Sequence, residues 1–520
     1  MGRQFTVEYD DFTGGHFVGD HEIKQPFNSW VGRGVCVTAD EGFLMADGGW
    51  TSSGLATGSG SMPTPTMPLA TYASGVPTGT TFVIDTTIYQ IDTSGTLNTR
   101  GTFASAPDSA THAVSAAGQV FFVNGANLYQ VQDSPTYTKV VTSLAVAGSF
   151  SEGVWRWKDW LVVPWGVSLY FSAPGVDSSM SFPSGNYIDI PGNQSITTVV
   201  PTADALYVAT SEAWWSITGV LGETTVLRRL TKSGTVRRAS TAVPPLPLSA
   251  CEVDAGIAYI GPTERELMVL QGSVPFRWLT MRADAPTFSR IVSCADAVLG
   301  VTSTDGYPPD AWIWSETARR WRRSPLPESS ILSGTDAGTV TSTAYYPVED
   351  LDALSSTLGV LVVTHATVPS SRWSARVFTQ AKNPLQPSVS SGGTTTAAPN
   401  EFAEAQVDLA DYMKVAPFRV KEMLVEVDKG RTDGADAAAR SLSAQLITHP
   451  IIEVAGGGAA GAGSGSSTQT VNFTPGDTEA GDREMVRFRL GDAGPTFTAK
   501  PRLTFKGVKI RRVILVCEDV

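Results

Sequence analysis

The stretch DWLVVPWGVSLYFSA (159–173) decides the fold that the sequence predicts. It consists of an apolar segment, a short turn and a second segment that begins with bulky residues, which is the pattern of a β-hairpin. The first segment is apolar at successive positions, so we expect both of its faces to be buried. A single hairpin cannot bury two faces by itself. The stretch therefore predicts further hairpins packed on either side of it.

The same pair of segments returns along the chain. A central residue of the first segment marks each return: Phe82, Phe121, Leu161, Leu206, Ala258, Val298 and Val360. These positions are separated by roughly 40 to 60 residues, which is the length of a propeller blade with loops of variable size. We therefore predict an all-β fold with a β-propeller of six or seven blades over residues 81–383. A long antiparallel sandwich or a solenoid is the alternative.

The composition agrees with short strands joined by turns. Only 17% of the 520 residues are charged, and the chain contains 50 Gly and 32 Pro. The formal net charge of -12 argues against a general nucleic-acid binder, which would need a basic face. No run of apolar residues is long enough to span a bilayer, so we expect no membrane insertion. The four cysteines have no CxxC spacing and are expected to be buried thiols: Cys36, Cys251, Cys294 and Cys517.

The segments outside the repeat have a different character. Ser, Thr, Gly and Pro dominate residues 51–80 and 384–400, so both are predicted to be flexible linkers. Residues 401–520 contain about six runs of alternating apolar and polar residues, which predicts a small antiparallel sandwich. Residues 1–50 hold an arm and the hairpin GVCVTADEGFLMADGG (34–49). We expect the arm to pack on this sandwich, so that the propeller is inserted into a β-sandwich platform.

The arm carries a recognisable pattern, DFTGGHFVGDHEIKQPFNSWVGRGV (11–35). It resembles the N-terminus of the tail nozzle (tail tubular B) proteins of short-tailed phages. The residues that match are Gly14, Gly15, Ile23, Pro26, Asn28, Trp30 and Gly42 to Leu44. The segment VDLADYMKVAPFRVKEMLVEVDKG (407–430) also looks like strands of a phage tail platform. The family often has a basic residue after the N-terminal hairpin, where this chain has Met45, Ala46 and Asp47.

The resemblance implies a structural virion protein located in a phage tail. Such a protein forms a homohexameric ring below the portal–adaptor complex, conducts genomic DNA and offers a surface to tail fibres or tip proteins. It implies no cofactor and no enzymatic activity. Contacts with a neighbouring subunit or the adaptor are then expected at Gly14, Gly15, Asn28 and Trp30. The alternative is that the arm wraps around its own domain.

Two basic clusters are candidates for contact with DNA or a partner protein. One contains Arg228 and Arg229, and the other places Arg319, Arg320, Arg322 and Arg323 around Trp321. Arg and aromatic side chains together hold nucleic acid or acidic protein surfaces. A subunit or fibre interface is a second interpretation. The third is that these are solvated strand ends whose Arg stems lie over Trp rings.

A glycine-rich loop, AGGGAAGAGSGSS (455–467), is a candidate for lining a channel. Its residues are small and uncharged, so the loop could narrow a lumen without gripping DNA. The candidate positions are Gly456, Gly457, Gly461 and Gly463.

A propeller also suggests an enzyme, and the runner-up function is a carbohydrate-binding or glycoside-hydrolysing protein. The sequence offers this little support, because the Asp-box fragments DTSGT (92–96) and STDGY (303–307) are incomplete. No GxSxG elbow or phosphate-binding loop is present. His16 and His21 flank Asp20, but their spacing does not favour a metal site.

Overall fold

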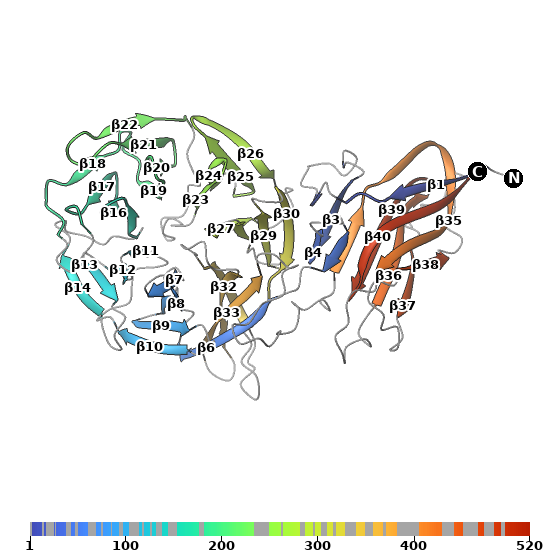
Figure 1. Ribbon diagram of the computed structural model, residues 1–520, viewed down its shortest axis with the longest axis horizontal. Coiled ribbons are helices and arrows are strands. Elements are labelled where there is room, and N and C mark those ends of the chain that lie inside the picture. The colour runs from blue at the N-terminus through green and yellow to red at the C-terminus, as the bar shows by residue number, and fades with distance from the viewer. Residues whose placement is uncertain are drawn as a thin grey trace, which may run out of the picture. The chain divides into compact units, whose positions relative to one another are not determined.

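The computed structural model contains β-strands and no helix in the residues that it describes. Figure 1 shows the arrangement of the strands. The described residues are 3–12, 15–16, 25, 28–37, 43–46, 50–60, 69–73, 76–84, 86–92, 97–102, 114–116, 119–124, 127–131, 138–143, 153–175, 181–232, 249–261, 264–280, 287–294, 297–302, 309–315, 319–327, 340–348, 357–367, 371–381, 405–428, 441–450, 466–472, 483–489 and 495–520. No helix suited to crossing a membrane occurs in these ranges.

The described strands between residues 51 and 381 form seven four-stranded antiparallel sheets, which we number as blades 1 to 7. Blade 1 contains β7 Leu69–Ala73, β8 Val76–Ile84, β9 Thr87–Asp92 and β10 Leu97–Thr102. Blade 2 contains β11 Val114–Ala116, β12 Gln119–Asn124, β13 Asn127–Val131 and β14 Thr138–Ser143. Blade 3 contains β15 Trp155–Trp157, β16 Trp160–Trp165, β17 Ser168–Phe171 and β18 Tyr187–Asp189. Blade 4 contains β19 Ile196–Pro201, β20 Leu206–Thr210, β21 Trp214–Thr218 and β22 Val226–Arg229. Blade 5 contains β23 Ala250–Val253, β24 Gly256–Ile260, β25 Glu266–Gln271 and β26 Val274–Thr280. Blade 6 contains β27 Phe288–Cys294, β28 Ala297–Thr302, β29 Asp310–Ser315 and β30 Arg320–Pro325. Blade 7 contains β31 Val340–Pro347, β32 Thr357–Ala366, β33 Arg372–Ala381 and β6 Thr51–Ser59.

The all-β class and the propeller are confirmed, and the number of blades in the described part is seven. The first strands of successive blades lie next to one another from β7 to β31, around the axis of the ring. Each residue that marked the repeat lies on the second strand of its blade and is at most 1% exposed: Phe82, Phe121, Leu161, Leu206, Ala258, Val298 and Val360. A second strand is covered by the neighbouring blades on both faces, which explains its unbroken apolar sequence.

The prediction of a flexible linker over residues 51–80 is wrong for the residues described there. Residues Thr51–Ser59 form β6, which pairs antiparallel with β33 and so completes blade 7 from the opposite end of the propeller sequence. Its pairing depends on backbone hydrogen bonds and on packing from β33, so the strand needs no apolar alternation of its own. Trp373 of β33 lies opposite Gly58.

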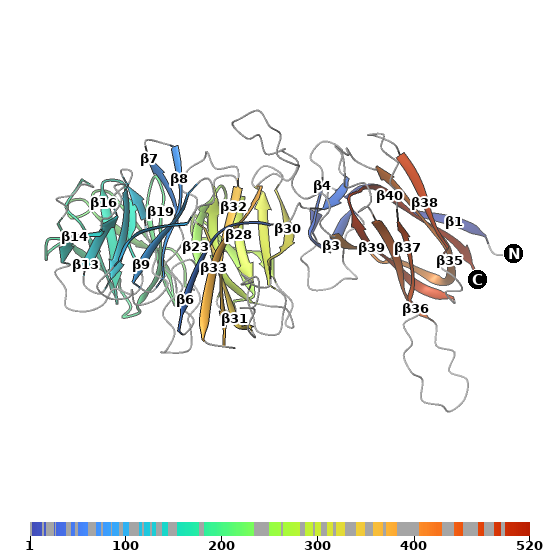
Figure 2. The same cartoon turned by 90° about the horizontal axis from the view of Figure 1, so that it is seen from below.

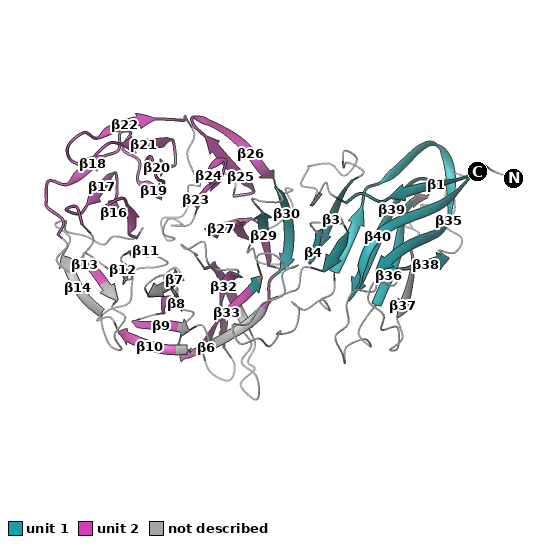
Figure 3. Ribbon diagram, viewed as in Figure 1, with its two compact units in different colours: residues 1–49, 313–325, 380–520 teal, residues 50–312, 326–379 magenta. Residues whose placement is uncertain are grey.

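The chain divides into two compact units (Figure 3). The first contains residues 1–49, 313–325 and 380–520, and the second contains residues 50–312 and 326–379. Besides β30 and the last residues of β29 and β33, the described strands of the first unit are β1 Gln4–Tyr9, β2 Gly15–His16, β3 Ser29–Arg33, β4 Val35–Val37, β5 Leu44–Ala46, β34 Ala405–Leu409, β35 Tyr412–Asp428, β36 Ser441–Pro450, β37 Ser466–Asn472, β38 Arg483–Arg489, β39 Thr496–Lys506 and β40 Lys509–Asp519.

These twelve strands form one sheet to which both ends of the chain contribute (Figure 2). One group pairs in the order β2-β3-β34-β39-β36-β37, and a second contains β38, β35, β40, β1 and the hairpin β4–β5. The groups are joined where the first residues of β35 pair with β39. A single apolar core draws side chains from both groups, including Trp30, Leu503 and Leu515. The predicted β platform and its N-terminal hairpin are therefore confirmed, although β37 was not among the predicted strands.

Candidate interaction surface

Burial is described for two of the N-terminal residues predicted to contact a partner, Asn28 and Trp30, and neither of these two is exposed. Trp30 lies on β3 opposite Leu409 and is 1% exposed, within the core of the first unit. Asn28 lies in the turn before β3 and is half-buried, and Gly15 begins the short strand β2. Gly14 lies outside the described residues. In this conformation, Trp30 stabilises its own unit and has no surface to offer a neighbour.

The two basic clusters lie on the outermost strands of different blades. Arg228 and Arg229 are exposed on β22 of blade 4. The Nε of Arg229 donates a hydrogen bond to the carbonyl of Thr231 (3.0 Å), and its guanidinium lies 5.8 Å from the ring of Trp215. This is the arrangement expected for an Arg stem over a Trp ring. Contact with DNA or a partner stays a prediction.

The second cluster is more buried than its sequence indicates. Arg322 on β30 is 9% exposed, Arg320 and Arg323 are half-buried, and Arg319 is exposed in the turn before the strand. Trp321 is buried and its ring lies 5.4 Å from that of Trp314. Arg319 thus has the most accessible side chain of the four. The candidate channel residues Gly456, Gly457, Gly461 and Gly463 lie outside the described part of the chain.

Five large apolar side chains are exposed in the described part of the first unit, and the sequence analysis identified none of them as a contact: Met413, Val415, Met485, Phe497 and Val520. Three of them lie at one irregularity in the pairing of β35 with β39. Met413 is 54% exposed, Val415 is 99% exposed and Phe497 is 41% exposed. We call these three residues the bulge surface. The three residues are near one another in the strand pairing, because Met413 is opposite Thr498, the residue after Phe497.

The bulge surface forms because β35 leaves its partner strand for four residues. Met413 pairs with Thr498 and Phe418 pairs with Thr496, so residues 414–417 have no counterpart on β39 except the single position of Phe497. Pro417 has no N–H to donate to a β-ladder, which favours a bulge at this place. The strand therefore loops outward and presents Val415.

Three aromatic rings lie at the base of the bulge. The ring centroids of Phe5 and Tyr412 are 6.0 Å apart, those of Phe5 and Phe418 are 6.0 Å apart, and those of Tyr412 and Phe418 are 5.4 Å apart. The ammonium of Lys414 lies 4.3 Å from the Phe5 centroid and also pairs with Asp519. Because these rings come from β1 and β35, the bulge is fixed to the N-terminal strand.

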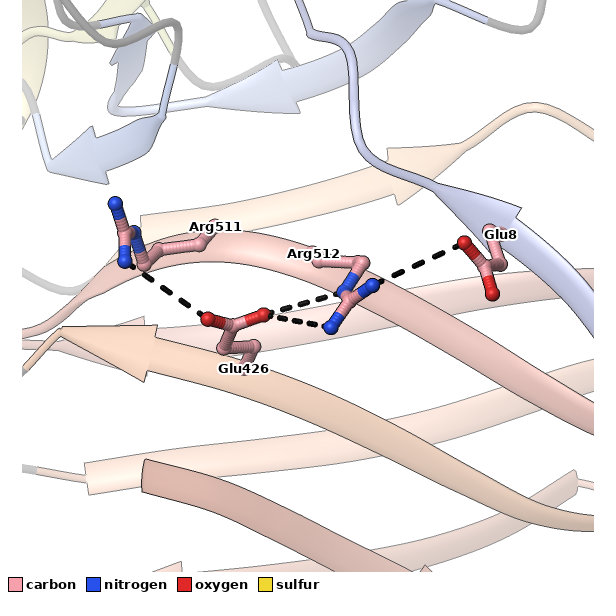
Figure 4. Close-up of polar contacts among 4 residues, drawn as sticks. All are labelled: Glu8, Glu426, Arg511 and Arg512. Carbon is pink, nitrogen blue, oxygen red and sulfur yellow. Dashed lines mark hydrogen bonds and ion pairs between the residues drawn. The ribbon is translucent and has the colours of Figure 1, made fainter. Parts of the chain in front are cut away.

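Backbone and charged contacts add to this support. The amide of Asp519 donates to the carbonyl of Arg3 (3.0 Å), and the amide of Val520 donates to that of Pro417 (3.3 Å). Further along the same strands, Glu426 accepts from Arg512 (3.1 Å) and lies 3.8 Å from Arg511 (Figure 4). Arg512 also lies 3.9 Å from Glu8 on β1. The bulge surface is thus held on a well-braced part of the sheet.

Among the described residues of the propeller, the carboxylates of Glu252 and Asp204 are close enough for their charges to interact. Glu252 lies on β23, the innermost strand of blade 5, and Asp204 lies in the turn between β19 and β20 of blade 4. Burial raises the pKa of the Glu252 carboxyl above its ordinary value, and the charge of Asp204 raises it further. No group of three or more His, Cys, Asp or Glu residues suited to a metal ion occurs within the described ranges.

No family model matches the sequence, and no curated protein matches it. Similar solved structures include PorZ, described as an essential surface component of the type-IX secretion system of Porphyromonas gingivalis, with 10% identity and a TM-score of 0.40 over 71% of this chain. The chain spans 44% of the length of PorZ. The WD40 domain of SCAP from fission yeast has 9% identity and a TM-score of 0.31, over 58% of this chain and 81% of that domain. A prolyl endopeptidase has 9% identity and a TM-score of 0.33, over 60% of this chain and 47% of its own. Because these scores are low, the propeller assignment rests on the strand pairing described above, and no activity follows from the likeness.

Proposed function

We propose that the chain is a structural subunit of a short-tailed phage tail, in which copies assemble into a ring through the first unit. The observation that carries this proposal is the bulge surface, where Met413, Val415 and Phe497 are exposed on a braced sheet. Exposed apolar side chains of this kind are removed from water when a second molecule covers them. The resemblance of residues 11–35 to tail nozzle proteins supports the phage assignment.

Burial of the bulge surface would contribute substantially to assembly. Full burial of a Val, Met or Phe side chain contributes about 1.5 to 3 kcal/mol. The aromatic rings and ion pairs below the bulge hold it in one conformation before contact, so little conformational entropy is lost on binding. A closed ring joins different surfaces of neighbouring copies, so we expect the bulge to insert into another face of the next subunit.

The remaining parts of the role follow from charge and topology. The formal net charge of -12 favours a conduit that passing genomic DNA does not adhere to. The exposed Arg228 and Arg229 on blade 4 then belong to a surface that meets fibres or tip proteins. The platform places β1 against β40, so both ends of the chain contribute to the unit that we propose to assemble below the adaptor.

Immunogold electron microscopy tests the location. Antibody against the recombinant chain is applied to particles from the source lysate. Gold at the tail end of the particles is expected. Gold restricted to cell debris contradicts a role in the virion.

A pair of variants tests the surface. Val415→Asp places a charge at the 99% exposed position of the bulge, whereas Val274→Asp places one on β26 at a 65% exposed position of blade 5. Particles or assembly reactions supplied with V415D are expected to incorporate at least tenfold less of the chain, measured by quantitative mass spectrometry of purified particles. V274D is expected to incorporate normally. Equal incorporation of both variants would show that the bulge surface is not the assembly contact.

A further inference from the structure

Blade 3 carries a row of aromatic rings on three successive strands. The rings of Trp165 on β16 and Tyr170 on β17 have centroids 6.2 Å apart, and Tyr170 lies 5.7 Å from Tyr187 on β18. Tyr187 is 47% exposed, and the other two are half-buried. We call these three residues the aromatic ladder. It lies within the second unit and is separate from the bulge surface.

A carboxylate and a hydroxyl lie on the same face of blade 3 as the ladder. In the strand register, Trp165 pairs with Ser168, and Ser168 pairs with Asp189. Alternate residues of a strand point to the same face, so Asp189 is the next residue to Tyr187 on that face. The hydroxyl of Ser168 donates a hydrogen bond of 2.6 Å to Oδ1 of Asp189, and the contact is exposed to solvent.

Apolar packing on the opposite face of blade 3 holds the strands that carry the ladder. Leu169 and Ile188 point to the opposite face and pack in the apolar cluster between blades 3 and 4, where Leu169 is fully buried. The segment before β18 is also tied to β17 and its continuation. The amide of Phe171 donates to the carbonyl of Asn186 (3.1 Å), and the amide of Ala173 donates to that of Ser181 (2.8 Å). The backbone that carries the exposed ring of Tyr187 is therefore held in place by packing and hydrogen bonds.

We propose that the aromatic ladder is a binding site for a neutral glycan chain. One face of a pyranose ring presents C–H groups that carry a slight positive charge, and these are attracted to the negative face of an aromatic ring. The hydroxyl groups at the edge of the same sugar are donors that match the carboxylate of Asp189. Here one exposed ring continues into two half-buried rings that pack against the apolar cluster of blades 2 and 3, and a carboxylate lies beside them, so both kinds of chemistry are present.

The arrangement selects among ligands. The negative charge of Asp189 repels acidic sugars, which favours neutral hexoses. A small cation would be enclosed best by rings that face one centre, whereas these rings follow one another across three strands, as suits an extended chain. The proposal does not rest on assembly in a phage tail, and either can fail without the other.

The test uses isothermal titration calorimetry of the full chain with three neutral probes: maltohexaose, cellohexaose and mannohexaose. At least one is expected to bind with a submillimolar Kd. Tyr187→Ala is expected to weaken that binding at least tenfold, while Tyr187→Phe, which keeps the ring, changes it less than threefold. Asp189→Asn is expected to weaken it severalfold. The matched control is Phe276→Ala, which removes a 38% exposed ring from the outermost strand of blade 5 and should leave Kd unchanged.

Several results would overturn the proposal. These are the absence of binding by all three neutral probes and unchanged affinity in Y187A. Choline and an oligogalacturonate hexamer are titrated in the same way, and binding by either of these alone would also overturn it. Sedimentation of Y187A without sugar provides a further check. If the substitution changes the association state of the chain, the ladder is a contact between copies and not a glycan site.

Discussion

Gly58 of β6 lies opposite Trp373 of β33, at the pairing that completes blade 7. The indole is so close that a Cβ at position 58 would come within 2.4 Å of its Cε2 and Cζ2 atoms. Blade 7, which closes the propeller, therefore requires a residue without a side chain at position 58 of β6.

Gly58→Ala is therefore expected to destabilise the propeller. Overpacking of this kind typically costs about 1 to 3 kcal/mol, whereas Gly to Ala in an open, ordinary backbone is neutral or slightly stabilising. The control is Gly185→Ala, because no atom lies within 4 Å of a Cβ built there. Urea unfolding followed by tryptophan fluorescence should show a lower midpoint for G58A alone. A midpoint equal to that of the wild type would mean that Trp373 moves aside at little cost.

Glu426→Gln tests the bracing between β35 and β40. The carboxylate pairs with Arg511, whose side chain is 13% exposed, and with Arg512 at 3.1 Å. Loss of the charge leaves a largely buried guanidinium without its counter-ion, so we expect a loss of about 1 to 3 kcal/mol in unfolding free energy. Glu8→Gln is the control, because Glu8 is 45% exposed and 3.9 Å from Arg512. Its effect should stay below about 0.5 kcal/mol. Similar losses in both variants, measured by chemical unfolding, would contradict this account.

Glu252 gives a pH dependence with a defined sign. Its folded-state pKa is raised above the ordinary 4.5 by burial and then by Asp204, so the folded protein disfavours the ionised carboxylate. Stability from this group is present below the unfolded pKa and is lost as the pH rises through the folded value. Glu252→Gln is therefore expected to raise the melting temperature at about pH 7 and to have a smaller effect at about pH 4. A larger gain at the acidic pH would reverse the sign and refute the prediction. Asp204→Asn should produce a weaker change in the same direction.

The four cysteines are expected to resist labelling in the folded protein. All four are buried thiols outside disulfide bonds, and burial is the main cause that raises the pKa of the Cys517 thiol to about 12. Because the thiolate is the reactive form, Ellman's reagent at about pH 8 should react only as the protein unfolds. Four thiols should then appear in denaturant. Rapid native labelling of Cys517 would show that the end of β40 opens readily.

The propeller could be predicted because the unbroken apolar sequence of its most buried strands indicates that both faces of each strand are covered. The apolar run LVVPW and its six counterparts need burial on both faces, and every marker from Phe82 to Val360 lies on a second strand. β6 could not be predicted in the same way. Its sequence TSSGLATGS reads as a linker, and of its residues described for burial only Ala56 is buried. Its strand structure comes from pairing with β33, which lies far away in the sequence.

The surfaces were harder to predict than the fold. The resemblance to tail nozzle proteins implied a contact at Trp30, and only the pairing of β3 with β34 places this residue in the core. The exposure of Val415 depends on the bulge, for which Pro417 in the run YMKVAPF is the sequence signal. The aromatic ladder joins residues from three strands, so it emerges only when their register is known.

The pairing of β1 with β40 has a consequence for synthesis on the ribosome. Gln4 is opposite Glu518 and Tyr9 is opposite Val513, so β1 finds its partner only after all seven blades that lie between the two strands in the sequence have been made. The seven blades can close earlier, once β33 is available for β6. Contacts between such distant segments form slowly. Strand β1 thus lacks its partner while the blades are being made, and a chaperone that shields its edge would raise the yield of folded chain.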